Sequence, residues 1–203
     1  AVFGTPDAVQ VLRTRLEEES KSDIREDIVL ALGIARSPEA IDALAGVLKS
    51  NRTHLHPYAL LALGLTHDAE RAGPILLEHL PTDLKRGKAG QDDASAAVMA
   101  LGALRHAPAE PVLLAAAKAK STPDFVKVYL AHALGRFGSE DARKAVETLA
   151  GSSDEDVARA AVLALGNFAD ASVTKALKEG LGRPDPRALL DLCMFAEGSR
   201  WEQ

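Results

Sequence analysis

Apolar residues recur three and four positions apart along most of the chain, in short runs separated by polar turns. This spacing places apolar side chains on one face of a helix. One such run follows Ser37-Pro38 and consists of Ile41, Leu44, Val47 and Leu48. Serine before proline is typical of a helix start, with the serine as N-cap and the proline at the first helical position. Since no stretch shows the sustained alternation of a β-strand, the pattern predicts an all-α protein.

The helices form a repeat. The tripeptide Ala-Leu-Gly occurs five times, with its glycines 31, 38, 33 and 31 residues apart. These glycines are Gly33, Gly64, Gly102, Gly135 and Gly166. Each period contains two predicted helices, and one such hairpin cannot bury its apolar face unless a neighbour covers it. The sequence therefore predicts about six stacked hairpins, near residues 5–35, 37–66, 68–105, 108–137, 139–168 and 170–197.

The last predicted hairpin differs from the others. Its second helix has Cys193-Met194-Phe195 in place of the tripeptide. Terminal repeats often depart from the pattern because they cap the stack, and truncation of a longer array would look the same. We expect residues 1–203 to form a single repeat domain. Because the chain starts at Ala1, that domain could equally be excised from a longer protein.

Two explanations are open for the repeated glycine. A glycine within the helix would let a neighbouring helix approach closely, whereas a glycine at the helix end would serve as a C-terminal cap. Both explanations favour the same stacked architecture.

One segment carries a family resemblance. Residues 156–166 read Asp-Val-Ala-Arg-Ala-Ala-Val-Leu-Ala-Leu-Gly. This resembles the second helix of a short bacterial HEAT repeat, also called phycobilisome-lyase HEAT-like. Ile24-Arg25 is similar to the Val-Arg pair of that family, and Lys127 takes the arginine position after Val126. The resemblance implies a right-handed α-solenoid (an ARM/HEAT-like α-α superhelix) whose second helices line the concave surface. It does not imply one function, because this fold carries scaffolds, adaptors and a few enzymes.

The second helices present a candidate binding face. Counted back from the glycine, positions −9, −5, −2 and −1 are mostly apolar or small, which predicts that they form the core. Positions −10, −7, −6 and −3 lie on a neighbouring face, and both tyrosines of the chain fall at −6. We expect a contact patch of Tyr58, Leu61, Met99, Phe125, Tyr129 and His132. The alternative is that these residues only widen the apolar core stripe.

The negative charge of the chain bears on whether its partner is a protein or a nucleic acid. The chain has a formal net charge of −5, and its predicted face carries acidic residues. These are Asp23, Asp27, Asp92 and Asp156. Because carboxylates repel phosphates, we expect a protein or peptide partner and no nucleic acid. No apolar run approaches the roughly 20 residues of a membrane span. The only cysteine, Cys193, cannot form an internal disulfide, so the cytoplasm is the default compartment and export is equally compatible.

The sequence shows no catalytic or metal-binding motif. HEAT-type deoxyhypusine hydroxylases carry His-Glu pairs, whereas none of the six histidines here precedes a glutamate. Cys193 lies among apolar residues, as inert core thiols do. No glycine-rich phosphate loop or nucleophile motif occurs. We therefore expect no catalytic residue, no metal and no cofactor.

The third repeat is longer than the others, and the extra residues fall at 81–91. Their proline and glycine content predicts a loop. Its basic residues Lys85, Arg86 and Lys88 could hold an anion. Nearby acidic residues cancel that charge, so a plain solvated loop is the preferred interpretation. These are Asp83, Asp92 and Asp93.

These observations favour a non-enzymatic scaffold or adaptor that binds a protein on the concave face of a solenoid. One alternative is a lyase-type enzyme or enzyme subunit resembling the phycobilisome HEAT-like lyases. Another is a structural spacer within a larger protein.

Overall fold

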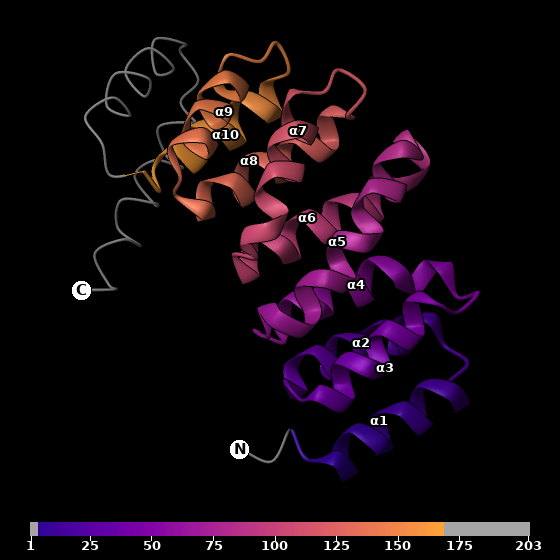
Figure 1. The fold of residues 1–203 in the computed structure, drawn as a ribbon. Coiled ribbons are helices and arrows are strands. Elements are labelled where there is room, and N and C mark those ends of the chain that lie inside the picture. The colour runs from indigo at the N-terminus through magenta and orange to yellow at the C-terminus, as the bar shows by residue number, and fades with distance from the viewer. Residues whose placement is uncertain (1–3, 169–203) are drawn as a thin grey trace. The chain divides into compact units, whose positions relative to one another are not determined.

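The computed structural model describes residues 4–168, and every regular element in that range is a helix (Figure 1). The α-helices are α1 (Pro6–Glu18), α2 (Ser22–Ala35), α3 (Pro38–Leu48), α4 (His56–Leu65), α5 (Ala69–Lys85), α6 (Gln91–Leu104), α7 (Glu110–Lys118), α8 (Asp124–Phe137), α9 (Glu140–Ala150) and α10 (Glu155–Leu165). Short 3-10 turns cover Thr53–Leu55, Gly87–Gly90 and Ala107–Ala109. The prediction of an all-α fold is confirmed.

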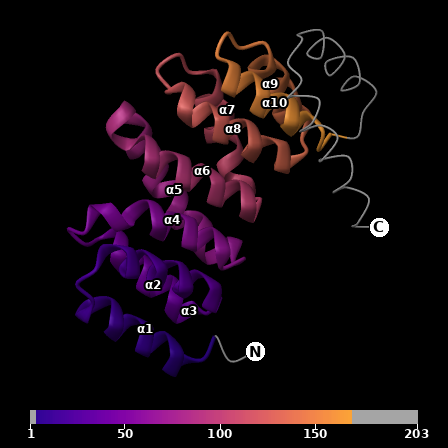
Figure 2. The same cartoon turned by 180° about the vertical axis from the view of Figure 1, so that it is seen from behind.

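The helices are arranged as consecutive hairpins in two compact units. The N-terminal unit, residues 1–109, contains the hairpins α1–α2, α3–α4 and α5–α6. The C-terminal unit, residues 110–203, contains α7–α8 and α9–α10 within its described part. Figures 1 and 2 show the hairpins of each unit from opposite sides. The predicted sixth hairpin, 170–197, lies outside the described residues, and a single domain over 1–203 stays a prediction.

Polar caps begin several helices as the sequence predicts. The Ala40 N–H donates a hydrogen bond to the Ser37 hydroxyl at 3.2 Å, and Pro38 follows in the first turn of α3. Ser139 caps α9 and Asp154 caps α10 in the same way, each at 3.0 Å. Each cap satisfies a backbone N–H that the first helical turn leaves without a partner.

The repeat tripeptide lies in the core. Its leucine is fully buried in all five repeats: Leu32, Leu63, Leu101, Leu134 and Leu165 are each 0% exposed. In α10 the other predicted core positions are equally buried, with Val157 and Ala161 at 0% and Ala164 at 1%. The assignment of these columns to the core is confirmed for α10.

The repeated glycines are close-approach positions within helices. A Cβ atom built on Gly33 would lie 2.4 Å from the Ala62 carbonyl oxygen. A Cβ on Gly64 would lie 2.8 Å from the Ala100 Cα, so each glycine contacts the alanine of the next repeat's tripeptide. Gly135 lies against Ala164 in the same register, at 3.0 Å. The C-cap explanation is therefore wrong for these three glycines, and it fits only Gly166, which caps α10.

The predicted loop at 81–91 is largely helical, which corrects the sequence interpretation. Helix α5 continues through Pro81 to Lys85, a 3-10 turn covers Gly87–Gly90, and Gln91 begins α6. Proline loses one helical hydrogen bond, but its fixed φ is compatible with a helix. The apolar stripe continues past it at a four-residue step: Leu76 and Leu80 are both 0% exposed, and Leu84 is half-buried. Burial of this stripe offsets the cost of the proline.

Candidate protein-binding surface

Each second helix presents one row of positions toward the same side of the helix, and most of the side chains in that row are at least partly exposed. Steps of four, three and four residues along a helix stay on one face, and they connect positions −10, −6, −3 and +1 relative to the repeat glycine. We call these positions the second-helix face. In the N-terminal unit they are Asp23, Asp27, Leu30 and Ile34 on α2; His54, Tyr58, Leu61 and Leu65 on α4 and its leading turn; and Asp92, Ala96, Met99 and Ala103 on α6.

Three residues of the predicted contact patch lie on this face of the N-terminal unit. Tyr58 and Leu61 are half-buried on α4. Met99 lies on α6, which packs against α4, and is 45% exposed. All three side chains therefore have surface that a partner could cover.

The other three patch residues lie on α8 of the C-terminal unit. Phe125 is 45% exposed, and its ring meets the Tyr129 ring edge-on, with centroids 5.3 Å apart and planes at 70°. Aromatic pairs favour this geometry. His132, one turn further on, is exposed, and the partial loss of water around its ring lowers the imidazole pKa. The neutral ring is therefore favoured at pH 7.

Two apolar residues of the same face were missed from the sequence. Ile34 is 58% exposed and Leu65 is 41% exposed, each one residue after the repeat glycine. They lie four residues after Leu30 and Leu61. Continuing the same helical step past the glycine would have found both.

A cavity of about 630 Å³ opens at the start of the second-helix face in the N-terminal unit. It brings together α2, α4, α6 and the turns that precede them. Its lining residues are Glu26, Thr53, His54, Pro57, Tyr58, Leu61, Arg86, Asp92 and Asp93. Tyr58 and Leu61 of the predicted patch therefore share one concave site with several charged groups.

Two carboxylates of this cavity interact with other residues of its lining. The Glu26 carboxylate favours the protonated Tyr58 hydroxyl as a hydrogen-bond acceptor, and this raises the pKa of Tyr58 above its usual value. Asp93 occupies position −9, where most repeats carry an apolar core residue, and is 9% exposed. The Arg86 guanidinium donates to its carboxylate at 2.9 Å and compensates for its burial. The sequence offers Arg86 as part of an anion site, but in the structure its guanidinium is paired with Asp93.

Replacing Glu26 with Gln should lower the pKa of Tyr58 toward 10, because the charged acceptor that stabilises the protonated phenol is removed. The measurement is a spectrophotometric titration of phenolate in a Tyr129→Phe background, in which Tyr58 is the remaining tyrosine. An unchanged titration midpoint after Glu26→Gln would show that the two side chains are not coupled.

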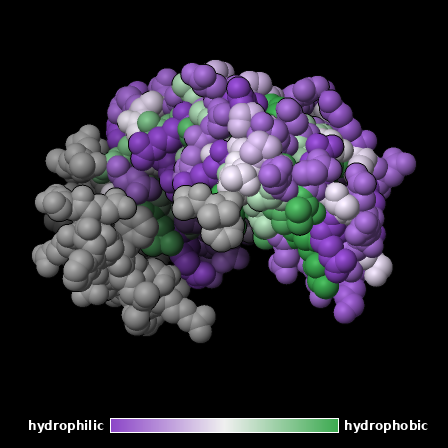
Figure 3. Space-filling view, turned by 90° about the horizontal axis from the view of Figure 1, so that it is seen from below, coloured by the Kyte–Doolittle hydropathy of each residue, from purple (hydrophilic) through white to green (hydrophobic). Residues whose placement is uncertain are grey.

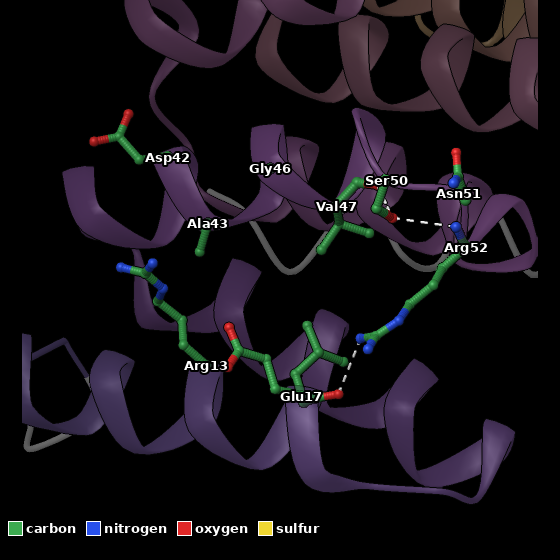
Figure 4. A pocket seen from close by; sticks show the side chains of 10 residues that line it. Arg13, Glu17, Asp42, Ala43, Gly46, Val47, Ser50, Asn51 and Arg52 are labelled. Carbon is green, nitrogen blue, oxygen red and sulfur yellow. Dashed lines mark hydrogen bonds between the residues drawn. The ribbon is translucent and has the colours of Figure 1, made fainter.

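A second cavity, of about 480 Å³, lies between the first helices α1 and α3 (Figure 4). Arg52 closes one side of it: its guanidinium donates to the Leu16 carbonyl at 3.1 Å, and its N–H donates to the Ser50 hydroxyl at 3.3 Å. Arg13 and Asp42 give its lining charges of both signs. None of the residues that line this second cavity belongs to the second-helix face.

The surface seen from the α1 end is mostly hydrophilic (Figure 3). Apolar side chains reach it in local groups. Exposed apolar groups that gather in one place often mark a binding surface.

Comparison with known proteins identifies the repeat. Residues 119–191 match the family model of HEAT repeats. This part of the chain, 73 of its 203 residues, therefore carries HEAT repeats. Its fold is similar to a chain in the complex of CpcE and CpcF of phycocyanin lyase from Nostoc sp. PCC7120, with a TM-score of 0.60 and 18% identity. That match covers 96% of this chain and 83% of the other. The HEAT-like α-solenoid class predicted from Ala-Leu-Gly is thus confirmed.

A second solved structure matches this chain more weakly. Human deoxyhypusine hydroxylase in complex with glycerol matches with a TM-score of 0.42 and 16% identity, over 96% of this chain and 85% of that one. A search of curated proteins found no match.

Within residues 4–168, no three His, Cys, Asp or Glu side chains are grouped so that they could hold a metal ion. None of the helices in this range combines the length and apolar character that crossing a bilayer requires. Cys193, the only cysteine, lies outside the described residues.

Proposed function

We propose that this HEAT-repeat chain is a non-enzymatic scaffold that binds a protein partner on its second-helix face. One observation carries the proposal. Of the five large apolar side chains that the described structure leaves exposed, four lie on the second helices of four consecutive repeats. They are Ile34, Leu65, Met99 and Phe125.

Physical chemistry supports a binding role for such a surface. Exposed apolar side chains on neighbouring elements gain free energy when a partner removes them from water. Tyrosine adds broad contact area and a hydrogen-bonding tip, and it is enriched at binding hot spots. Because the stacked helices within each unit hold their side chains in place before binding, little conformational entropy is lost there when the partner docks.

The similar solved structure supports the same reading. That chain was determined in a complex of CpcE with CpcF, so a related helical stack assembles with another protein chain. The lyase alternative also concerns a protein of this fold, but at 18% identity the similarity concerns the fold alone.

The double variant Tyr58→Ala/Tyr129→Ala should capture its partner from native lysate about tenfold less well than the parent, since each tyrosine has the character of a hot-spot residue. Capture is quantified by mass spectrometry of the retained proteins. Helix content, followed by circular dichroism, should stay unchanged because neither side chain is fully buried.

The matched control is Glu78→Ala/Lys118→Ala, which removes one exposed side chain from a first helix of each unit. It should capture as much partner as the parent. Equal capture by the tyrosine variant would reject the proposed face. A chromophore co-purifying with the chain would favour the lyase alternative instead.

A further inference from the structure

The second-helix face of the N-terminal unit has two chemically different halves. At the start of the helices it carries Asp23, Asp27, His54 and Asp92, all exposed. Toward the helix ends it carries apolar side chains, of which Ile34, Leu65 and Met99 are 58%, 41% and 45% exposed. Each of the three helices therefore runs from a polar start to an apolar end.

The packing of the helices keeps like halves together. Near the helix ends, Gly33 of α2 contacts Ala62 of α4, and Gly64 of α4 contacts Ala100 of α6. At the helix starts, one cavity is lined by Glu26 of α2, by His54 in the turn before α4, and by Asp92 of α6. The contacts near the helix ends and the shared cavity at the helix starts show that the three helices lie side by side and run in the same direction. The acidic groups thus form one edge of the face and the apolar groups the other.

The cavity at the acidic edge carries a net negative charge. Arg86 is paired with Asp93, so these two charges cancel. The carboxylates of Glu26 and Asp92 are left on the lining, beside the half-buried Tyr58 and Leu61. Carboxylates next to an aromatic side chain suit a cationic side chain, which gains from both ion pairing and contact with the ring. The same charges disfavour a phosphate or an acidic peptide.

We propose that the N-terminal unit binds an amphipathic helix of a partner protein that carries lysine or arginine beside its apolar face. The apolar side of that helix covers Ile34, Leu61, Leu65 and Met99, by the helix-in-groove mode in which residues i, i+3, i+4 and i+7 act as anchors. One of its cationic side chains enters the cavity between Glu26 and Asp92. This inference rests on the proposed function and adds the chemistry of the partner.

The probe is a phage-displayed library of random helical 16-residue peptides, selected on the full chain. The selected peptides should combine apolar residues at helical spacing with a net positive charge. Synthetic copies should bind less tightly as salt is raised, because ion pairs at an accessible cavity are screened. The Leu65→Ser/Met99→Ser variant should lose these peptides.

The charge is tested by the variant Glu26→Gln/Asp92→Asn, in which shape and hydrogen-bonding length are kept. We expect it to bind the selected peptides about tenfold more weakly at low salt, since two charged partners of the cation are removed. The control Glu39→Gln/Glu78→Gln changes the net charge equally on the first helices α3 and α5. Its affinity should stay within about twofold of the parent.

The outcomes separate this inference from the proposed function. Peptides that require Leu65 and Met99 but are neutral or acidic would overturn the cationic helix and leave the scaffold in place. Affinity unchanged by Glu26→Gln/Asp92→Asn would do the same. Concentration-dependent self-association through this face would assign it to a second copy of the chain and also overturn the inference. If no selected peptide depends on the face and the tyrosine variant captures normally, both proposals fail.

Discussion

Replacing Gly33 with Ala is expected to destabilise the protein by about 2–3 kcal/mol, the cost of forcing an extra carbon into a packed interior. The added Cβ would lie 2.4 Å from the Ala62 carbonyl oxygen and 2.8 Å from the Ala62 Cα. Both atoms belong to the backbone of α4, so no side-chain rotation can relieve the contact, and α2 and α4 must separate. The free energy of unfolding is measured by urea titration followed by circular dichroism.

Gly46→Ala is the matched control. Gly46 also lies inside a helix, α3, but a Cβ built there meets nothing within 4 Å. Alanine should therefore raise stability by about 0.5–1 kcal/mol through its better helix propensity. If Gly33→Ala were as stable as the parent, the close helix contact that we assign to the tripeptide would be wrong.

The second large effect is expected at Leu63, the leucine of the second Ala-Leu-Gly. Leu63 is 0% exposed in the core of the N-terminal unit, so Leu63→Ala should cost about 2–5 kcal/mol through lost burial and the cavity left behind. Thermal or urea unfolding measures this loss.

Leu65→Ala compares the same chemical change two residues further along α4. Because Leu65 is 41% exposed, its replacement should alter stability by less than about 1 kcal/mol. The contrast tests whether the second-helix face is free surface or part of the core. Equal losses at Leu63 and Leu65 would show that the apolar edge is buried, and the face could not then bind a partner.

The sequence predicted the stack because the features that specify it are local and recur. The tripeptide repeats with nearly one period, and its leucines, including Leu32 and Leu134, are buried as expected. The helix caps at Ser37 and Ser139 follow from residue type and position alone. The role of the repeated glycine could not be decided in this way, because close approach depends on the neighbouring helix. It is resolved by contacts between helices, such as those of Gly33 with Ala62 and of Gly64 with Ala100.

Interactions between distant parts of the chain escaped the sequence analysis. The prediction of a loop at 81–91 is wrong because it treats Pro81 as a residue that ends a helix. Burial of Leu80 keeps α5 helical through this proline. The cavity was not foreseen, since it combines Glu26 with groups from two later helices. Its Arg86–Asp93 pair spans the turn between α5 and α6 and places a charge at a core position. Pairing across turns leaves no periodic signal in the sequence.

Site-specific photocrosslinking shows whether a partner docks on the second helices. A photoreactive phenylalanine analogue replaces Leu65 on the second-helix face or, as the control, Glu78 on the first helix α5, and the chain is irradiated in its native lysate. We expect a discrete crosslinked protein from position 65, reduced by Tyr58→Ala, and none from position 78. Crosslinks from position 78 alone, or the same product from both positions, would contradict a partner bound on the second helices.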